Sequence, residues 1–138
     1  MPQTRPWPTN PVIFEVNTAT WLEAHSRAEG RPLGLGEVPA SAWDELAATR
    51  ATAVWLMGIW ERSPVGQTIA RELPQLHAGY WAALSDLTPA DVLGSPYCVR
   101  RDLPDARFGG VAGLTKAREE LARRGIGLLL DFVPNHLA

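Results

Sequence analysis

Three short apolar runs along the chain predict its strands. Each is β-branched, aromatic or continuously apolar, as strands of a buried parallel sheet are: Val12–Val16, Ala53–Met57 and Gly127–Leu130. Segments of helical periodicity lie between them, and this alternation predicts parallel strands joined by right-handed crossovers. The chain is therefore expected to be an α/β protein.

One helix is expected between the first two strands. Ser41 is predicted to be its N-cap, because Ser41 and Asp44 have the spacing of a capping box. Trp43 and Leu46 then lie on its apolar face, and the helix is expected to end near Arg50. The residues before it, from Trp21 to Pro39, contain several glycines and prolines and are read as a loop with a helical turn at 22–27.

A second helix is expected before the last strand. It follows Gly109-Gly110, carries Leu114, Ala117 and Leu121 on its buried face, and ends at Gly125 in a left-handed conformation. Residues 59–108 form a long insertion after the second strand. A connection of this length is expected to have structure of its own, and we predict three helical pieces: Thr68–Leu76, Ala78–Leu84 and Pro89–Leu93.

Two architectures fit this order of elements, an open doubly wound sheet and the first part of a (β/α)8 barrel. A doubly wound dinucleotide fold would carry Gly-x-Gly-x-x-Gly after the first strand, and neither that motif nor a Walker motif is present. Both absences favour the barrel. We therefore expect residues 1–11 to form a proline-rich leader and residues 12–138 to form three βα units of a barrel, with a helical insertion after the second strand.

Composition excludes several classes of function. The net charge is −2, with 46% hydrophobic and 20% charged residues, so there is no basic stripe of the kind that binds nucleic acid. No apolar stretch has the length of a membrane span or of a signal peptide, and a cytoplasmic location without membrane contact is expected. Cys98 is the only cysteine, which excludes an intrachain disulfide.

The last strand is followed by the sequence Asp131-Phe132-Val133-Pro134-Asn135-His136, which carries the strongest chemical signal. In parallel α/β proteins, substrate-handling groups gather at the carboxyl ends of strands. The imidazole of His136 could bind a hydroxyl group or a metal, act as a general acid–base, or simply end the strand in a turn. The side-chain carbonyl of Asn135 suits a hard cation such as calcium.

Other residues have competing interpretations. Asp131 is expected inside the strand as a hydrogen-bond hub, with direct catalysis as the alternative, in which Glu61 would be its partner acid. Among the tryptophans, Trp55 is expected to pack in the core, as Trp43 is. Trp60 and Trp81 fall in loop-like sequence, where core packing and stacking on a ligand are equally plausible.

The hexapeptide beginning at Asp131 resembles the first conserved motif of the α-amylase family, glycoside hydrolase family 13. The likeness extends over most of the chain: Val12–Thr18 resembles the first barrel strand of that family, Val54–Trp60 the second, and Ser95–Gly110 the stretch that leads into its second helix. The resemblance implies an incomplete catalytic barrel, because only three of its eight strands can be matched and the chain ends soon after the motif.

The resemblance also implies roles for individual residues. His136 would hydrogen-bond the sugar at the point of cleavage, Tyr97 would form a stacking platform under it, and Asp131 would help to organise the site. Asn135 would match a position that ligates a structural calcium ion in many members; no other cofactor is implied. The nucleophile and the general acid–base of the family belong to later strands, so no catalytic residue is expected in this chain.

The expected function is therefore part of a glycoside hydrolase that acts on α-glucosidic bonds, with an α-glucoside or oligosaccharide as substrate and the remainder of the barrel as partner. This chain alone is expected to be inactive. Two alternatives remain open: a fragment of a glucosyl-transferring relative, and a non-catalytic carbohydrate-binding or interaction module. The sequence departs from the family after Tyr97, where it continues as Cys98-Val99-Arg100-Arg101-Asp102: acids common in relatives are lost there and arginines are gained.

Overall fold

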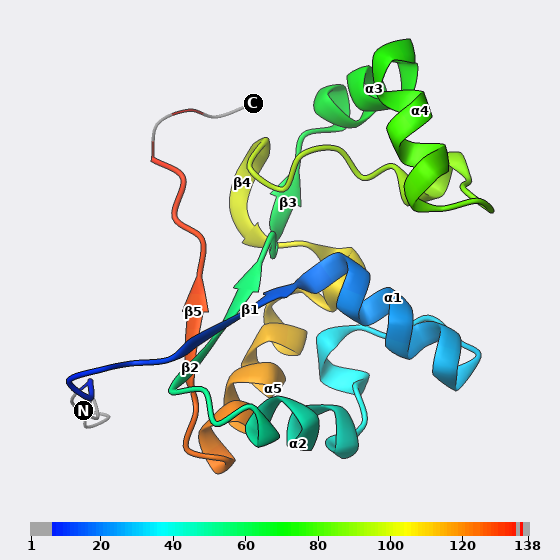
Figure 1. The fold of residues 1–138 in the computed structure, drawn as a ribbon. Helices are drawn as coiled ribbons and strands as arrows, with labels where there is room; N and C mark the ends of the chain where they lie inside the picture. The colour runs from blue at the N-terminus through cyan, green and yellow to red at the C-terminus, as the bar shows by residue number, and fades with distance from the viewer. Residues whose placement is uncertain (1–6, 135, 137–138) are drawn as a thin grey trace.

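Residues 7–134 and 136 are described by a computed structural model, which comprises a three-stranded parallel sheet, a two-stranded antiparallel ribbon and a helical insertion (Figure 1). The strands are β1 (Ile13–Asn17), β2 (Ala53–Met57), β3 (Trp60–Arg62), β4 (Val99–Pro104) and β5 (Gly127–Leu130). The helices are α1 (Thr18–Glu29), α2 (Ala40–Ala48), α3 (Pro64–Glu72), α4 (Pro74–Ala83) and α5 (Gly110–Arg123). Three short 3₁₀ turns lie between these helices and strands: η1 (Leu35–Glu37), η2 (Pro89–Asp91) and η3 (Ala106–Phe108).

The three predicted strands form one parallel sheet in the order β1-β2-β5. Their register aligns Glu15 with Trp55 and Trp55 with Leu129. The α/β class and the parallel pairing are confirmed. The sheet is not closed into a barrel in the described residues, and β1 and β5 are its two edges.

The sheet has one covered face and one open face. Val16, Val54 and Leu56 point into a core that they share with residues of α2 and α5, among them Trp43 and Leu121. Figure 1 shows α2 and α5 together on this side of the strands. Side chains along a strand alternate between the two faces of the sheet, so the residues next to Val16, Val54 and Leu56 in their strands point to the open face. On that open face Ile13 is 50% exposed, and Trp55 and Leu129 are only partly buried.

The first helix corrects the expectation of a loop between Trp21 and Pro39. α1 begins directly after β1, where the side chain of Asn17 accepts a hydrogen bond from the backbone N–H of Thr20. It ends at Gly30, which adopts a left-handed conformation with a φ of 68°. Asn17 and Gly30 are therefore the two boundary residues of this helix, and Asn17 is also the last residue of β1.

The second helix forms where expected but without the predicted cap. The N-cap is Pro39, no side chain caps the helix, and Ser41 lies within its first turn. Asp44 accepts a hydrogen bond from Arg124 of the neighbouring helix end at 2.8 Å, so it is not part of a capping box. The helix ends at Ala48 rather than near Arg50, while Trp43 is buried as predicted, with 1% of its surface exposed.

The insertion is helical, as expected, but it also contains an antiparallel ribbon that the sequence did not reveal. α3 and α4 begin earlier than predicted, each with a proline in its first turn. β3 and β4 pair across residues 63–98 and frame this helical excursion. Trp60 therefore lies in a strand and Trp81 in a helix, rather than in loops. The helix after Gly109 forms as predicted, and Gly125 has a φ of 72°.

Candidate functional site

A pocket of about 540 Å³ lies over the open face of the sheet, beside β5 and the segment that follows it. It contains three of the predicted site residues, Tyr97, Asp131 and His136. The rest of its wall is mostly apolar: Ile13, Trp55, Leu129, Leu130, Phe132 and Val133. Trp55 was expected in the core, but it is half-buried and faces this pocket, because its position in β2 alternates with the core-facing residues.

His136 and Tyr97 meet at this pocket although they are 39 residues apart. The Nε2 atom of His136 lies 3.1 Å from the backbone carbonyl oxygen of Tyr97. A carbonyl oxygen only accepts, so Nε2 carries the proton in this hydrogen bond. In the neutral imidazole, Nδ1 is then an acceptor and is suited to a hydroxyl donor.

Asp131 is buried and holds three elements together. Its Oδ1 accepts a hydrogen bond from the indole nitrogen of Trp55 at 2.9 Å, and its Oδ2 accepts from the backbone N–H of Gly58 at 2.5 Å. Its backbone oxygen accepts from the indole nitrogen of Trp60 at 2.8 Å. The carboxylate is thus satisfied by several donors, as expected of a hub. It lies one residue beyond β5, however, and not inside the strand.

The ring of Tyr97 forms an exposed part of the wall, with 41% of the residue accessible. Partial burial raises the pKa of its hydroxyl, and the negative charges of Asp131 and Glu15 raise this pKa further. The phenol therefore stays neutral at physiological pH, and its hydroxyl can both donate and accept hydrogen bonds.

Trp60 and Glu61 do not line this pocket. Trp60 packs against the hydrophobic core while its indole nitrogen binds Asp131. The carboxylate of Glu61 is held by Arg100 at 3.0 Å and by Arg101 at 2.5 Å, on the β3–β4 ribbon. The structure therefore gives Glu61 and Asp131 separate partners, and it does not bring them together as an acid pair in one pocket.

Asn135, the candidate calcium ligand, lies outside the described residues. The described residues contain no group of three or more His, Cys, Asp or Glu side chains able to hold a metal ion. The oxygens of Asp131 are directed at Trp55 and Gly58. The described residues therefore form no cradle for calcium.

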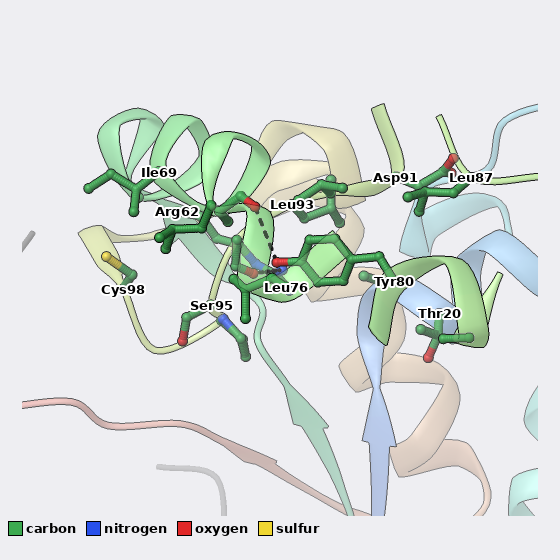
Figure 2. Close-up of a pocket in the computed structure, with 18 of the residues that line it drawn as sticks. Thr20, Arg62, Ile69, Leu76, Tyr80, Leu87, Asp91, Leu93, Ser95 and Cys98 are labelled. Atoms are coloured by element: carbon green, nitrogen blue, oxygen red, sulfur yellow. Dashed lines mark hydrogen bonds between the residues drawn. The ribbon is translucent and has the colours of Figure 1, made fainter. Parts of the chain in front are cut away.

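A larger pocket, of about 620 Å³, lies away from these residues, between the α3–α4 insertion and the start of α1. Figure 2 shows its walls, with Cys98 and Ile69 toward one end and Asp91 and Thr20 toward the other. The hydroxyl of Tyr80 donates to the carbonyl of Ala70 within it. Its lining is mainly aliphatic, and it contains none of the predicted site residues.

Comparison with known proteins finds no protein-family model that matches this chain and no curated protein that matches it. Over the part of the chain that the structure describes, none of the helices combines the length and apolar character needed to cross a membrane.

Proposed function

We propose that this chain forms three βα units of an α-amylase-type (β/α)8 barrel and contributes part of the sugar-binding wall of a glycoside hydrolase acting on α-glucosidic bonds. The observation that carries the proposal is the convergence of His136 on Tyr97 beside the buried Asp131. His136 and Tyr97 are the residues to which the family resemblance assigns sugar contacts, and Asp131 the one that it expects to organise the site. They come from two distant segments, so their proximity is a property of the fold and not of the motif.

The arrangement of the sheet supports the barrel. The strands follow one another in the order β1-β2-β5 without reversal, and α2 and α5 pack on the same face. A doubly wound sheet reverses its strand order and places helices on both faces. In a barrel, the face opposite the helices becomes the packed interior, and here that face carries Ile13, Trp55 and Leu129.

The pocket chemistry suits a sugar. The exposed ring of Tyr97 provides a flat surface for the apolar face of a pyranose, and Nδ1 of His136 provides an acceptor for one of its hydroxyl groups. Asp131 has a positioning role, because its carboxylate accepts hydrogen bonds from the indole nitrogen of Trp55 and from the backbone N–H of Gly58. In this proposal the nucleophile and the general acid–base come from the remaining strands of the barrel, which are its partner. This chain alone is inactive, and the protein is cytoplasmic.

The experiment is an assay of the complete enzyme, in which this sequence and the remaining strands of the barrel are present together, on maltose, maltotriose, trehalose and sucrose, with β-linked cellobiose as the control. Cleavage or transfer of at least one α-glucoside, and none of cellobiose, is the expected result. His136→Ala should lower kcat/KM by about tenfold or more, since one lost hydrogen bond costs roughly 1–3 kcal/mol. Tyr97→Phe keeps the carbonyl that orients His136 and should retain most activity. Inactivity on every α-glucoside would overturn the proposal.

A non-catalytic carbohydrate-binding module is the second candidate. It is favoured by the state of the two acids considered for catalysis: Glu61 is paired with Arg100 and Arg101, and Asp131 is hydrogen-bonded to Trp55 and Gly58. Maltose titrated into the folded chain should then quench or shift the fluorescence of Trp55, which lines the pocket. Trp55→Phe should abolish that signal. An unchanged spectrum at saturating sugar would exclude binding by this module.

A further inference from the structure

A third pocket, of about 520 Å³, lies between the β3–β4 ribbon and η3. Three arginines line it, Arg62, Arg101 and Arg107, together with the carboxylates Glu61 and Asp105. None of these residues lines the pocket that contains His136. This pocket is therefore separate from the proposed sugar-binding pocket.

Arg62 is a buried charge without a carboxylate partner. Only 7% of the residue is exposed, and Nη1 donates to the backbone oxygen of Gly94 at 2.9 Å. Its Nε is buried and finds no acceptor among the described residues. Burying a guanidinium without a paired anion is costly, because its lost hydration is not replaced. The site is therefore incomplete as it stands.

The two carboxylates in this pocket already accept hydrogen bonds from arginines other than Arg62. Glu61 accepts hydrogen bonds from Arg100 and Arg101, and Asp105 accepts them from Arg107 at 2.5 to 3.1 Å. Three arginines therefore share the two carboxylates and Arg62 pairs with neither, in a chain whose overall net charge is −2. The local excess of positive charge is opposite in sign to that of the protein as a whole.

The arginines also repel one another. Burial lowers the pKa of Arg62, and the positive charge of Arg107 lowers this pKa further, with partial compensation by Asp105 and Asp131. Arg101 and Arg107 each use Nε and Nη2 on their carboxylates. Their Nη1 atoms have no acceptor within the described part of the chain. An anion bound between these guanidinium groups would reduce the repulsion between them. It would also accept hydrogen bonds from those of their N–H groups that have no acceptor in the described residues.

We propose that this pocket binds the phosphate group of a phosphate monoester, with Arg62, Arg101 and Arg107 as its ligands. Guanidinium groups match phosphate oxygens in geometry, and several of them around one anion are typical of phosphate recognition. The pocket is larger than a phosphate ion and falls within the range of small-molecule sites, so it has room for the organic part of the ester. Leu103 and Val111 supply an apolar wall for that part.

The test measures binding of inorganic phosphate and of glycerol 3-phosphate to the full chain by calorimetry, against sodium chloride of equal ionic strength. Both should bind saturably, the ester more tightly. Arg101→Gln should weaken phosphate binding by about tenfold, the loss of one charge-assisted hydrogen bond. It is a mild substitution, because Glu61 keeps Arg100. Arg123→Gln on α5 removes the same charge outside the pocket and should change the affinity less than about twofold.

A second variant tests the role of the buried charge. Arg62→Met removes the unpaired guanidinium but keeps much of the side-chain volume, so phosphate should raise the Tm of the native chain and not that of the variant. The proposal is overturned by any one of three results: no saturable binding relative to chloride, equal weakening by Arg123→Gln, or an unchanged phosphate-induced rise in Tm for Arg62→Met. Equal affinity for both probes would reduce the site to one for inorganic phosphate.

Discussion

Trp55 and Asp131 are 76 residues apart, and the indole nitrogen of Trp55 donates to the carboxylate of Asp131 at 2.9 Å. This bond links the middle strand of the sheet to the segment that leads to His136. The same carboxylate accepts from the backbone of Gly58, just beyond the end of β2. The position of the candidate sugar-binding segment is therefore fixed by a buried polar contact between neighbouring strands.

Removing this carboxylate should destabilise the chain. Asp131→Ala leaves the indole nitrogen and a buried backbone N–H without acceptors, which should lower the free energy of unfolding by about 2–4 kcal/mol. Trp55→Phe removes one donor only and should cost about 1 kcal/mol. Urea unfolding followed by circular dichroism measures both. Equal costs for the two variants would show that Asp131 does not serve as a hub.

The Asp105–Arg107 pair predicts a pH dependence of stability. Burial alone would raise the pKa of Asp105, but hydrogen bonds from the side chain and backbone of Arg107, with the charges of Arg107 and Arg62, lower it below 3.8. A carboxyl whose pKa is lower in the folded state stabilises the fold above its unfolded pKa, and this stabilisation is lost as pH falls through the folded pKa.

Asp105→Asn should therefore cost about 1–3 kcal/mol near neutral pH, the range for a hydrogen bond to a charged group. The difference from the native chain should shrink as pH falls below about 4. Unfolding curves of both proteins between pH 7 and pH 2.5 make the comparison. A difference that stays constant over this range would contradict the assignment.

Gly58 is required for two separate reasons. It has a φ of 77°, and a Cβ atom there would lie 2.8 Å from Cβ of Pro96 and 3.0 Å from Nη2 of Arg62. Gly30 has a similar φ of 68° but open space around it, which makes it a matched control. Gly58→Ala should cost about 1–3 kcal/mol more than Gly30→Ala, because overpacking adds to backbone strain. Thermal unfolding of the two variants measures this difference in stability. Equal Tm values would show that the close contacts around Gly58 have no steric effect.

The open face of the sheet should make the isolated chain associate or unfold with low cooperativity. Ile13 and Phe132 are 50% and 81% exposed, and both edge strands of the parallel sheet are unpaired within the described residues. Ile13→Lys should reduce association in sedimentation velocity. Val65→Lys, at an exposed position on α3, should not. A native chain that stays monomeric and melts sharply would contradict this prediction.

The sequence by itself determined the three strands of the parallel sheet, their parallel pairing and the last helix. β2 and β5 are local apolar runs, and α5 has a one-sided apolar pattern that ends at Gly125, so short-range periodicity was sufficient. It also gave Tyr97, Asp131 and His136 as candidate site residues, through the resemblance of their segments to a known family. The helix after β1 was missed because Asn17 is both a strand terminator and an N-cap, and only packing distinguishes the two.

Only the tertiary structure decided which of these residues meet. The contact of His136 with Tyr97, the binding of Asp131 by two tryptophans, and the pairing of Glu61 with arginines all join segments 39 to 76 residues apart. Such contacts depend on strand register and on the path of the insertion, which no local pattern encodes. The burial of Arg62 without a carboxylate is likewise invisible in sequence, because a side chain loses its hydration only when distant segments close around it.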